Sequence, residues 1–309
     1  MERLDGGSAV PPAFRGGIVA LGNFDGFHLG HQAVVGRAVA RARAERRPAI
    51  VATFDPHPVR HFKPDAPPFR LTTLDQRQRL FGEAGADAML VFHFDDALAG
   101  LHARDFVAQQ LVDRIGAGGV VTGADFTFGK GRDGNVAVLH ALGAESGFSV
   151  DTVDPVMLDG EAVSSSRIRD LLHAARPRDA ARLLSRPFAI EGVVEDGAKL
   201  GRDLGYPTAN LRLGTYLRPA YGIYAVRGRL DDGRVIDGVA SLGIRPTFQP
   251  PVELLEPYLF DFAGDLYGRT VEVALIDYLR PEAKFDSLDA LKVQIAADCD
   301  AARAALAQG

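Results

Sequence analysis

Two histidines stand three residues apart in the stretch GNFDGFHLGH, which covers residues 22–31. At this spacing, His28 and His31 can present both imidazoles to one ligand. Three glycines of the stretch permit the tight turns and close backbone approach that phosphates require: Gly22, Gly26 and Gly30. A histidine pair can also bind a metal, with Asp25 as a further ligand, relay protons or simply pack. The motif alone leaves these alternatives open.

The surrounding sequence places this motif between a strand and a helix. The apolar run Ile18–Leu21 precedes it, and the alanine- and arginine-rich stretch His31–Arg46 that follows has helical spacing. In an open α/β sheet, ligands bind beyond the carboxyl ends of the strands, where a helix N-terminus offers free N–H groups to an anion. We therefore expect an anion site at this junction.

A second candidate site is the stretch GAKLGRDLGYPTANL, residues 197–211. It combines glycines with two cations and then offers Thr208 and Asn210 as neutral oxygen ligands, which suit Mg²⁺ when ATP completes the coordination shell. A glycine-rich hairpin explains the stretch equally well. The sequence contains no G-x-x-x-x-G-K-[ST] motif, so we expect no Walker-type ATP site.

The elements that must position these groups differ between the two halves of the chain. Up to about residue 184, apolar runs alternate with amphipathic stretches, which predicts an α/β domain with a parallel, Rossmann-like sheet. The predicted strands are Ile18–Leu21, Ala49–Phe54, Ala88–Phe94, Gly119–Thr122 and Val150–Val156. The predicted helices are His31–Arg46, Leu74–Glu83, Ala103–Ile115 and Val136–Ser146, the second after the capping-box sequence TLDQ. We interpret residues 1–16 as a loose leader.

After LLSRP at residues 183–187, short β-rich runs are separated by glycine, proline and aspartate turns. A hairpin is expected to turn at residues 231–233, and the whole segment predicts a small antiparallel barrel covered by a terminal helix over Leu288–Leu306. A chain of 309 residues is long for one core. We therefore predict two domains, residues 1–185 and 186–309.

The composition is that of an ordinary globular protein, with 47% hydrophobic and 24% charged residues. A formal net charge of −5 argues against a protein that coats nucleic acid nonspecifically. Cys299 is the only cysteine, which excludes an intrachain disulfide and a cysteine-based metal site. The N-terminal residues lack the apolar centre of a secretory signal, and no apolar run approaches the ~18 residues that span a bilayer. We expect a cytoplasmic protein.

The first motif resembles that of the HxGH nucleotidylyltransferases, and GNFDGFHLGHQ is most similar to their FAD synthetase branch. The segments TFDPHP, VTGADFTFGKGRDG and VSSSRIRDLL follow in the order of that branch. The resemblance implies that His28, His31 and Asn23 handle ATP phosphates during adenylyl transfer. It implies that four residues at the start of a second helix, in VSSSRIRDLL, contact the same phosphates: Ser164, Ser165, Ser166 and Arg169. Three weaker flavin-side or metal-side candidates are Asp55, His57 and Asp125. Roles in a turn or a helix cap explain these residues about equally well.

The second site is similar to the G-R-x-L-G-[FY]-P-T-A-N signature of riboflavin kinases, and PAYGIYAV, GVASLGIRPTF and EPYLFDFAGDLYG follow it in order. The resemblance implies a six-stranded barrel in which Thr208 and Asn210 bind Mg²⁺. Phosphorylation of a hydroxyl needs a base. The resemblance implies that Glu256 is this base, because it stands at the family's position, and Glu253 is a nearby competitor. The resemblance also implies an ATP-phosphate role for Gly197, Gly201 and Arg202, and a place near those phosphates for Arg245.

Together the resemblances predict a bifunctional enzyme that phosphorylates riboflavin to FMN and then adenylates FMN to FAD, with ATP and Mg²⁺. Small molecules are the expected partners (ATP, riboflavin and FMN), with no nucleic acid, no membrane and at most weak self-association. A different phosphorylated acceptor for the first domain, and a flavin carrier with disabled sites, are the alternatives. Departures from the family pattern are Ala175, Ser185, Ser241-Leu242 and Tyr258.

Overall fold

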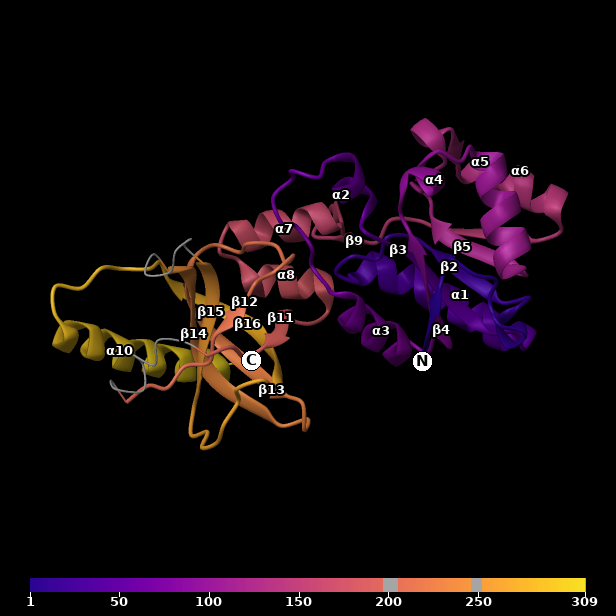
Figure 1. The fold of residues 1–309 in the computed structure, drawn as a ribbon. Helices are drawn as coiled ribbons and strands as arrows, with labels where there is room; N and C mark the ends of the chain where they lie inside the picture. The colour runs from indigo at the N-terminus through magenta and orange to yellow at the C-terminus, as the bar shows by residue number, and fades with distance from the viewer. Residues whose placement is uncertain (197–204, 246–251, 309) are drawn as a thin grey trace. The chain divides into compact units, whose positions relative to one another are not determined.

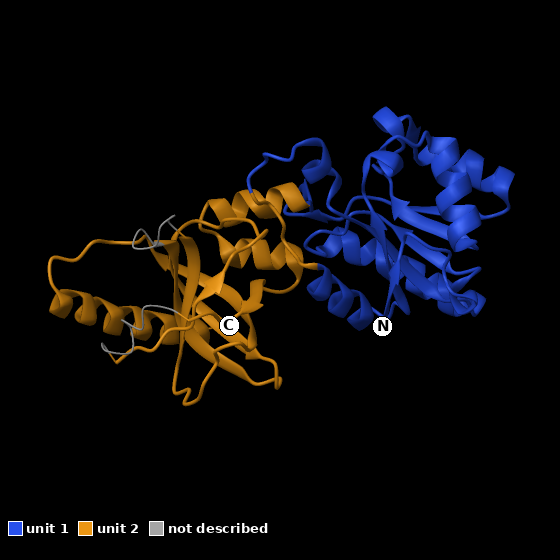
Figure 2. Ribbon diagram, in the orientation of Figure 1, with its two compact units in different colours: residues 1–67, 74–164 blue, residues 68–73, 165–309 orange. Residues whose placement is uncertain are grey.

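The structure is a computed structural model that describes residues 1–196, 205–245 and 252–308. It divides into two compact units (Figure 2). Unit 1 comprises residues 1–67 and 74–164, and unit 2 comprises residues 68–73 and 165–309.

A six-stranded parallel sheet forms the centre of unit 1 (Figure 1), with the strand order β1-β4-β3-β2-β5-β8. Its strands are β1 (Glu2–Asp5), β2 (Ile18–Leu21), β3 (Ala49–Asp55), β4 (Ala88–His93), β5 (Gly119–Gly123) and β8 (Ser149–Val153). The predicted parallel sheet is therefore confirmed. Two short antiparallel pairs lie outside it, β6 (Thr127–Phe128) with β7 (Gly134–Asn135), and β9 (Met157–Leu158) with β10 (Glu161–Ala162).

Helices cover both faces of this sheet, which explains why its central strands are largely apolar, with β2 apolar at every position. In β2, Ile18 and Ala20 belong to one buried cluster, whereas Val19 and Leu21 belong to the other. The helices of unit 1 are α1 (Leu29–Glu45), α2 (Pro58–Phe62), α3 (Leu74–Glu83), α4 (Asp96–Ala99), α5 (Ala103–Phe106), the π-helical η2 (Val107–Ile115) and α6 (Val136–Ser146). Two single 3₁₀ turns are η1 (Pro12–Phe14) and η3 (Lys130–Arg132).

The interpretation of residues 1–16 as a loose leader is wrong. Residues Glu2–Asp5 form the edge strand β1, which pairs in parallel with β4, and η1 follows. Leu4 and Val10 are buried in the core of unit 1. A four-residue edge strand with one buried side chain has no readable periodicity, which is why the sequence gives no signal for it. The predicted strand Val150–Val156 also differs, because β8 ends at Val153.

A six-stranded antiparallel sheet forms the barrel of unit 2, in the order β11-β16-β13-β14-β15-β12. Its strands are β11 (Phe188–Val193), β12 (Leu211–Arg212), β13 (Gly222–Leu230), β14 (Val235–Arg245), β15 (Val252–Leu259) and β16 (Thr270–Arg280). An antiparallel bridge between Glu195 and Asn210 joins the chain after β11 to the chain before β12, so the sheet is nearly closed. The predicted hairpin turn lies between β13 and β14, where Gly233 has a φ of 87°.

In the described part of unit 2, three helices accompany the barrel: α7 (Ser165–His173), α8 (Pro177–Leu184) and α10 (Leu288–Ala307). The last confirms the predicted terminal helix. It packs on β13, β14 and β16 through a cluster that includes Ala225, Val239 and the buried Cys299. Arg280 and Asp298 add two parallel hydrogen bonds of 2.7 and 2.6 Å between β16 and α10.

Two departures from the family pattern occupy left-handed backbone positions. Ala175, after α7, has a φ of 58°, and Ser185, at the end of α8, has a φ of 60°. Glycine adopts this conformation without strain, whereas other residues lose about 1–2 kcal/mol there. The substitutions therefore leave the two helix ends in the conformation that glycine favours.

Among the described residues, the helices include none with the length and apolar character needed to cross a membrane.

Candidate active sites

The first histidine motif lies at the junction of β2 and α1. His28 is the N-cap of α1, and its Nδ1 accepts a hydrogen bond from the backbone N–H of His31 at 3.4 Å. The two imidazole rings stack with their centroids 3.6 Å apart. His28 is buried and His31 is half-buried. The structure therefore brings both histidines to the helix N-terminus, where backbone N–H groups attract anions.

The loop before the helix holds an unusual backbone conformation. Phe24, Gly26 and Phe27 all have positive φ values, of 50°, 87° and 45°. Such conformations persist only where the surrounding structure enforces them, and they concentrate at functional sites. The rings of Phe24 and Phe27 pack on Phe81 of α3, with centroid distances of 5.8 and 5.0 Å. Helix α3 therefore supports the loop through this aromatic contact.

Gly30 lies where the chain leading to the serine run approaches the motif. A Cβ atom at this position would lie 3.2 Å from the His28 ring and 3.6 Å from the carbonyl oxygen of Val163. Ser164 follows Val163 directly and is half-buried in unit 1. The structure thus places Ser164 close to the histidine motif.

A cavity of about 400 Å³ opens beside this loop, and Asn23 is one of its lining residues. Its wall is strongly aromatic and contains Phe54, Phe62, Phe94, Phe106, Phe126 and Phe128. His57 also lines it, while its Nδ1 accepts the Val59 N–H at 3.2 Å as the N-cap of α2. Lys63 and Arg132 add positive charge. Such a cavity suits a flat, aromatic and anionic ligand.

Other first-site candidates do not line this cavity. Asp55 ends β3, and Asp125 is exposed in the loop after β5. Ser165 and Ser166 begin α7 in unit 2. Within that unit, Arg169 donates from Nε to the Phe69 carbonyl at 2.8 Å, and its guanidinium carbon lies 5.3 Å from the Phe69 ring centroid.

In unit 2, the chain around Thr208 and Asn210 runs beside β15. Leu211 pairs with Leu255, and the Ala209 N–H bonds the Pro257 carbonyl at 3.0 Å. The same antiparallel register places Asn210 opposite Glu256. Because residues that face each other across two strands point to the same side of the sheet, the amide and the carboxylate lie on one face, with Thr208 two residues further along. The structure thus brings these three predicted site residues together.

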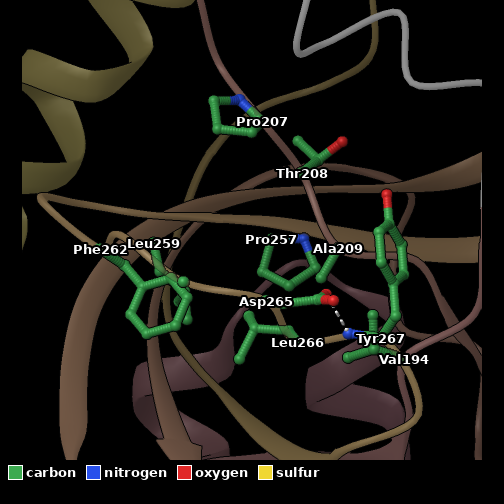
Figure 3. A pocket seen from close by; sticks show the side chains of 11 residues that line it. Val194, Pro207, Thr208, Ala209, Pro257, Leu259, Phe262, Asp265, Leu266 and Tyr267 are labelled. Carbon is green, nitrogen blue, oxygen red and sulfur yellow. Dashed lines mark hydrogen bonds between the residues drawn. The ribbon is translucent and has the colours of Figure 1, made fainter.

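Thr208 also lines a small cavity between this segment and the loop after β15 (Figure 3). Pro207 and Ala209 flank Thr208 on one wall, and the loop contributes Asp265 and Tyr267. The Asp265 carboxylate accepts the backbone N–H of Tyr267 at 2.9 Å, which holds the DLYG turn in place (Figure 3). The cavity therefore joins two segments that the sequence singled out, PTAN and DLYG.

Glu253, the competitor of Glu256, is engaged in a local network. One of its carboxylate oxygens accepts from Nε of Arg218 at 2.7 Å, and the other accepts from the Tyr221 hydroxyl. Partial burial opposes ionisation of Glu253, but the hydrogen bonds from Tyr221 and Arg218 outweigh it and lower the pKa of the carboxylate. Burial, followed by the nearby Glu253, raises the pKa of Tyr221 to about 12. These contacts give Glu253 a structural role.

Several predicted residues lie outside the described structure. Gly197, Gly201 and Arg202 fall in the segment 197–204, and the Arg245 side chain is likewise not described. In the described ranges, no group of three or more histidine, cysteine, aspartate or glutamate side chains is arranged to hold a metal ion. The neutral oxygens of Thr208 and Asn210 are a different kind of donor set, one that Mg²⁺ accepts.

These features define a two-domain, phosphate-handling enzyme. Family models agree on both halves: an FAD synthetase model matches residues 10–167, and a riboflavin kinase model matches residues 184–306. A bifunctional riboflavin kinase/FMN adenylyltransferase of Pseudomonas fluorescens is 42% identical, covering 98% of this chain and 97% of its own. The relative of that name from Haemophilus influenzae is 39% identical, over 98% of this chain and 99% of its own.

A solved structure described as a macrolide-efflux protein from Streptococcus pneumoniae covers 98% of this chain and 99% of its own, with a TM-score of 0.87 and 31% identity. The two chains share their fold over nearly their whole length. The chain belongs to the family of bifunctional riboflavin kinase/FMN adenylyltransferases, with the FAD synthetase half first and the riboflavin kinase half second. Its ATP co-substrate and its flavin substrates and products fit these two activities.

Two features of the first site were not predicted from the sequence. The aromatic cavity is one, although phenylalanines recur between residues 54 and 128 in TFDP, VFHF and DFTFG. That recurrence could have indicated a shared aromatic wall. The other is Arg77 of α3, whose guanidinium is buried below the loop. An arginine in an amphipathic helix gives no sequence signal of burial.

Proposed function

We propose that FMN is adenylated at the junction of β2 and α1. The flavin ring of FMN lies in the aromatic cavity. The FMN phosphate attacks the α-phosphorus of ATP in line, the bond between the α-phosphorus and the bridging oxygen breaks, and pyrophosphate leaves. His28 and His31 stabilise the charge on the ATP phosphates together with Asn23, the backbone of Gly22 and Gly30, and the group Ser164, Ser165, Ser166 and Arg169. The enzyme contributes positioning and electrostatic stabilisation.

One observation carries this proposal, namely that Asn23 belongs both to the histidine motif and to the lining of the aromatic cavity. An acceptor held in the cavity therefore has its phosphate end beside the residues that handle ATP. The aromatic wall favours an isoalloxazine ring over a smaller acceptor. His57 fits a place at the flavin side, whereas Asp55 and Asp125 stay predictions from the sequence.

In the second domain, Glu256 takes the proton of the riboflavin primary hydroxyl as its oxygen attacks the γ-phosphorus of ATP. The O–H bond breaks, a new P–O bond forms, and ADP leaves. Thr208 and Asn210 would hold Mg²⁺, which neutralises phosphate charge when it is bound. Gly197, Gly201, Arg202 and Arg245 are proposed to contact the nucleotide phosphates.

The functional boundary is proposed between residues 185 and 186. It differs from the division into compact units, because α7 and α8 group with the barrel. The FAD synthetase model ends at residue 167 and the riboflavin kinase model begins at residue 184, two residues before the proposed second domain. A cytoplasmic location, the absence of nucleic-acid partners and weak self-association stay predictions.

A chromatographic time course tests these assignments. The purified protein is supplied with riboflavin, ATP and Mg²⁺, and in a parallel sample with FMN in place of riboflavin. We expect FMN to appear first and FAD second in the first sample, and FAD alone in the other. Omission of Mg²⁺ should stop both reactions. If neither product formed in the presence of Mg²⁺, the assignment would be wrong.

A further inference from the structure

Arg77 is a buried cation to which the proposed reactions give no role. It belongs to α3 and is only 1% exposed. A buried guanidinium is costly unless hydrogen bonds satisfy it. Its Nη1 donates to the backbone carbonyl of Asn23 at 3.2 Å and to the Thr53 hydroxyl at 3.0 Å. The partners therefore come from the histidine-motif loop and from β3.

Thr53 strengthens the same contact. Its hydroxyl, itself fully buried, donates to the Asn23 carbonyl at 2.8 Å. One carbonyl oxygen thus receives two donors, one of them charged, and charge-assisted hydrogen bonds are the stronger kind. The three groups fix the position of a single peptide unit at the entrance to the loop.

The position of that peptide unit determines where the following loop residues lie, up to the histidine motif. Phe24, the next residue, is the first of the three left-handed residues, and its ring packs on the His31 ring in a T-shaped arrangement at a centroid distance of 5.3 Å. Phe81, one helical turn after Arg77, packs on the rings of Phe24 and Phe27. Helix α3 therefore supports the loop at two points. The charge of Arg77 contacts the loop backbone, and the Phe81 ring contacts the loop side chains.

We propose that Arg77 is a positioning residue for FMN adenylylation, which acts by fixing the Asn23 carbonyl and thereby the loop that carries His28 and His31. The inference rests on the proposed role of that loop. Arg77 itself contacts neither substrate. Its loss should lower kcat for FAD formation, because the phosphate-handling groups are no longer held in the reactive arrangement.

Three variants test this role in the full-length protein. Arg77→Met keeps a long side chain without donors, and Arg77→Lys keeps the charge. Leu139→Ala is the control for general loss of stability, because Leu139 is fully buried in the cluster on the opposite face of the same sheet from Phe24 and Phe27. Melting temperature, kcat and KM for FAD formation from FMN, and the rate of FMN formation from riboflavin are measured for each.

For Arg77→Met we expect a fall of at least 10-fold in kcat for FAD formation, with FMN formation within 2-fold of the wild type. Arg77→Lys should recover a large part of the loss, while Leu139→Ala should lower the melting temperature but keep kcat. If Arg77→Met kept kcat, or if Leu139→Ala lost as much activity well below its melting temperature, the proposal would be overturned. If Arg77→Met did not fold, Thr53→Val, which removes the other donor to the Asn23 carbonyl, would take its place, and wild-type kcat in a folded Thr53→Val protein would overturn the proposal as well. A wild-type protein that formed no FAD would instead contradict the proposed function.

Discussion

The two halves of the molecule have proposed ATP-phosphate sites that are built by different means. The proposed site of the first half combines a strained loop, a helix N-terminus and a stacked histidine pair, of which His28 is buried and His31 half-buried. The proposed site of the second half combines neutral oxygens with a half-buried carboxylate on neighbouring segments of a barrel. Adenylyl transfer from ATP needs stabilisation of charge, because the attacking phosphate is already ionised, whereas phosphorylation of a hydroxyl also needs a base.

This difference explains why the sites are built on different elements. A loop with three left-handed residues can wrap backbone N–H groups around an anion, but it must be held in place by buried groups such as Arg77. A strand register instead sets Asn210 opposite Glu256 without any backbone strain. The comparison predicts that single substitutions will separate the two activities.

The largest expected effect is on the kinase. Glu256→Gln removes the proposed base while keeping the size of the side chain, so FMN formation should fall by about 10²–10⁴-fold. FAD formation from supplied FMN should be unchanged. Glu253→Gln is the matched control and should keep most of the kinase rate, because Glu253 is already bonded to Arg218 and Tyr221. Loss of FMN formation in Glu253→Gln but not in Glu256→Gln would reverse the assignment of the base.

The reciprocal change is His28→Asn. Asparagine still offers an N-cap acceptor to α1, so the substitution removes the imidazole and largely spares helix stability. FAD formation should fall by about 10²–10³-fold, the range for removal of one group that stabilises transition-state charge. FMN formation, measured on the same sample, should persist. If a folded His28→Asn protein lost both activities, the division into two independent sites would be wrong.

Much of this architecture could be predicted from the sequence, because it depends on local signals. The central strands of unit 1 are buried on both faces and therefore form nearly continuous apolar runs. The hairpin at residues 231–233 follows from its Asp-Asp-Gly turn, and α10 from its helical spacing. The histidine motif sits where a strand must end and a helix begin. These features need no knowledge of distant contacts.

The remaining features depend on contacts between residues far apart in the sequence. Strand β1 is stabilised by β4, more than eighty residues later in the chain. The aromatic cavity gathers residues from Asn23 to Arg132. The helical spacing of Ala103–Ile115 predicts a helix but cannot distinguish the π-helical hydrogen bonding of η2. Residue-type patterns carry no information about such pairings.

A smaller effect is expected from the aromatic cavity. Phe62 is 66% exposed, which is unusual for so large an apolar side chain. Because an aromatic contact adds about 0.5–1.5 kcal/mol, Phe62→Ala should raise KM for FMN by about 2- to 10-fold. Kinase activity and melting temperature should change little. Val293→Ala, at a residue 72% exposed on α10, is the control and should leave this KM unchanged. Equal KM values for the two variants would remove Phe62 from the flavin site.

The smallest effect concerns stability near the second site and follows from the lowered pKa of Glu253. An unfolded glutamate titrates near 4.5, and in the folded protein the bonds from Tyr221 and Arg218 shift that titration to lower pH. The stabilisation is therefore complete above the unfolded value and is lost as the pH falls through the lowered pKa. Thermal melts of the wild type and Glu253→Gln should differ most near neutral pH and converge as the pH falls below the unfolded value. Tyr221 stays a neutral donor throughout this range, because its pKa is about 12. A difference that widened in acid would show that the ionised carboxylate of Glu253 does not stabilise the barrel.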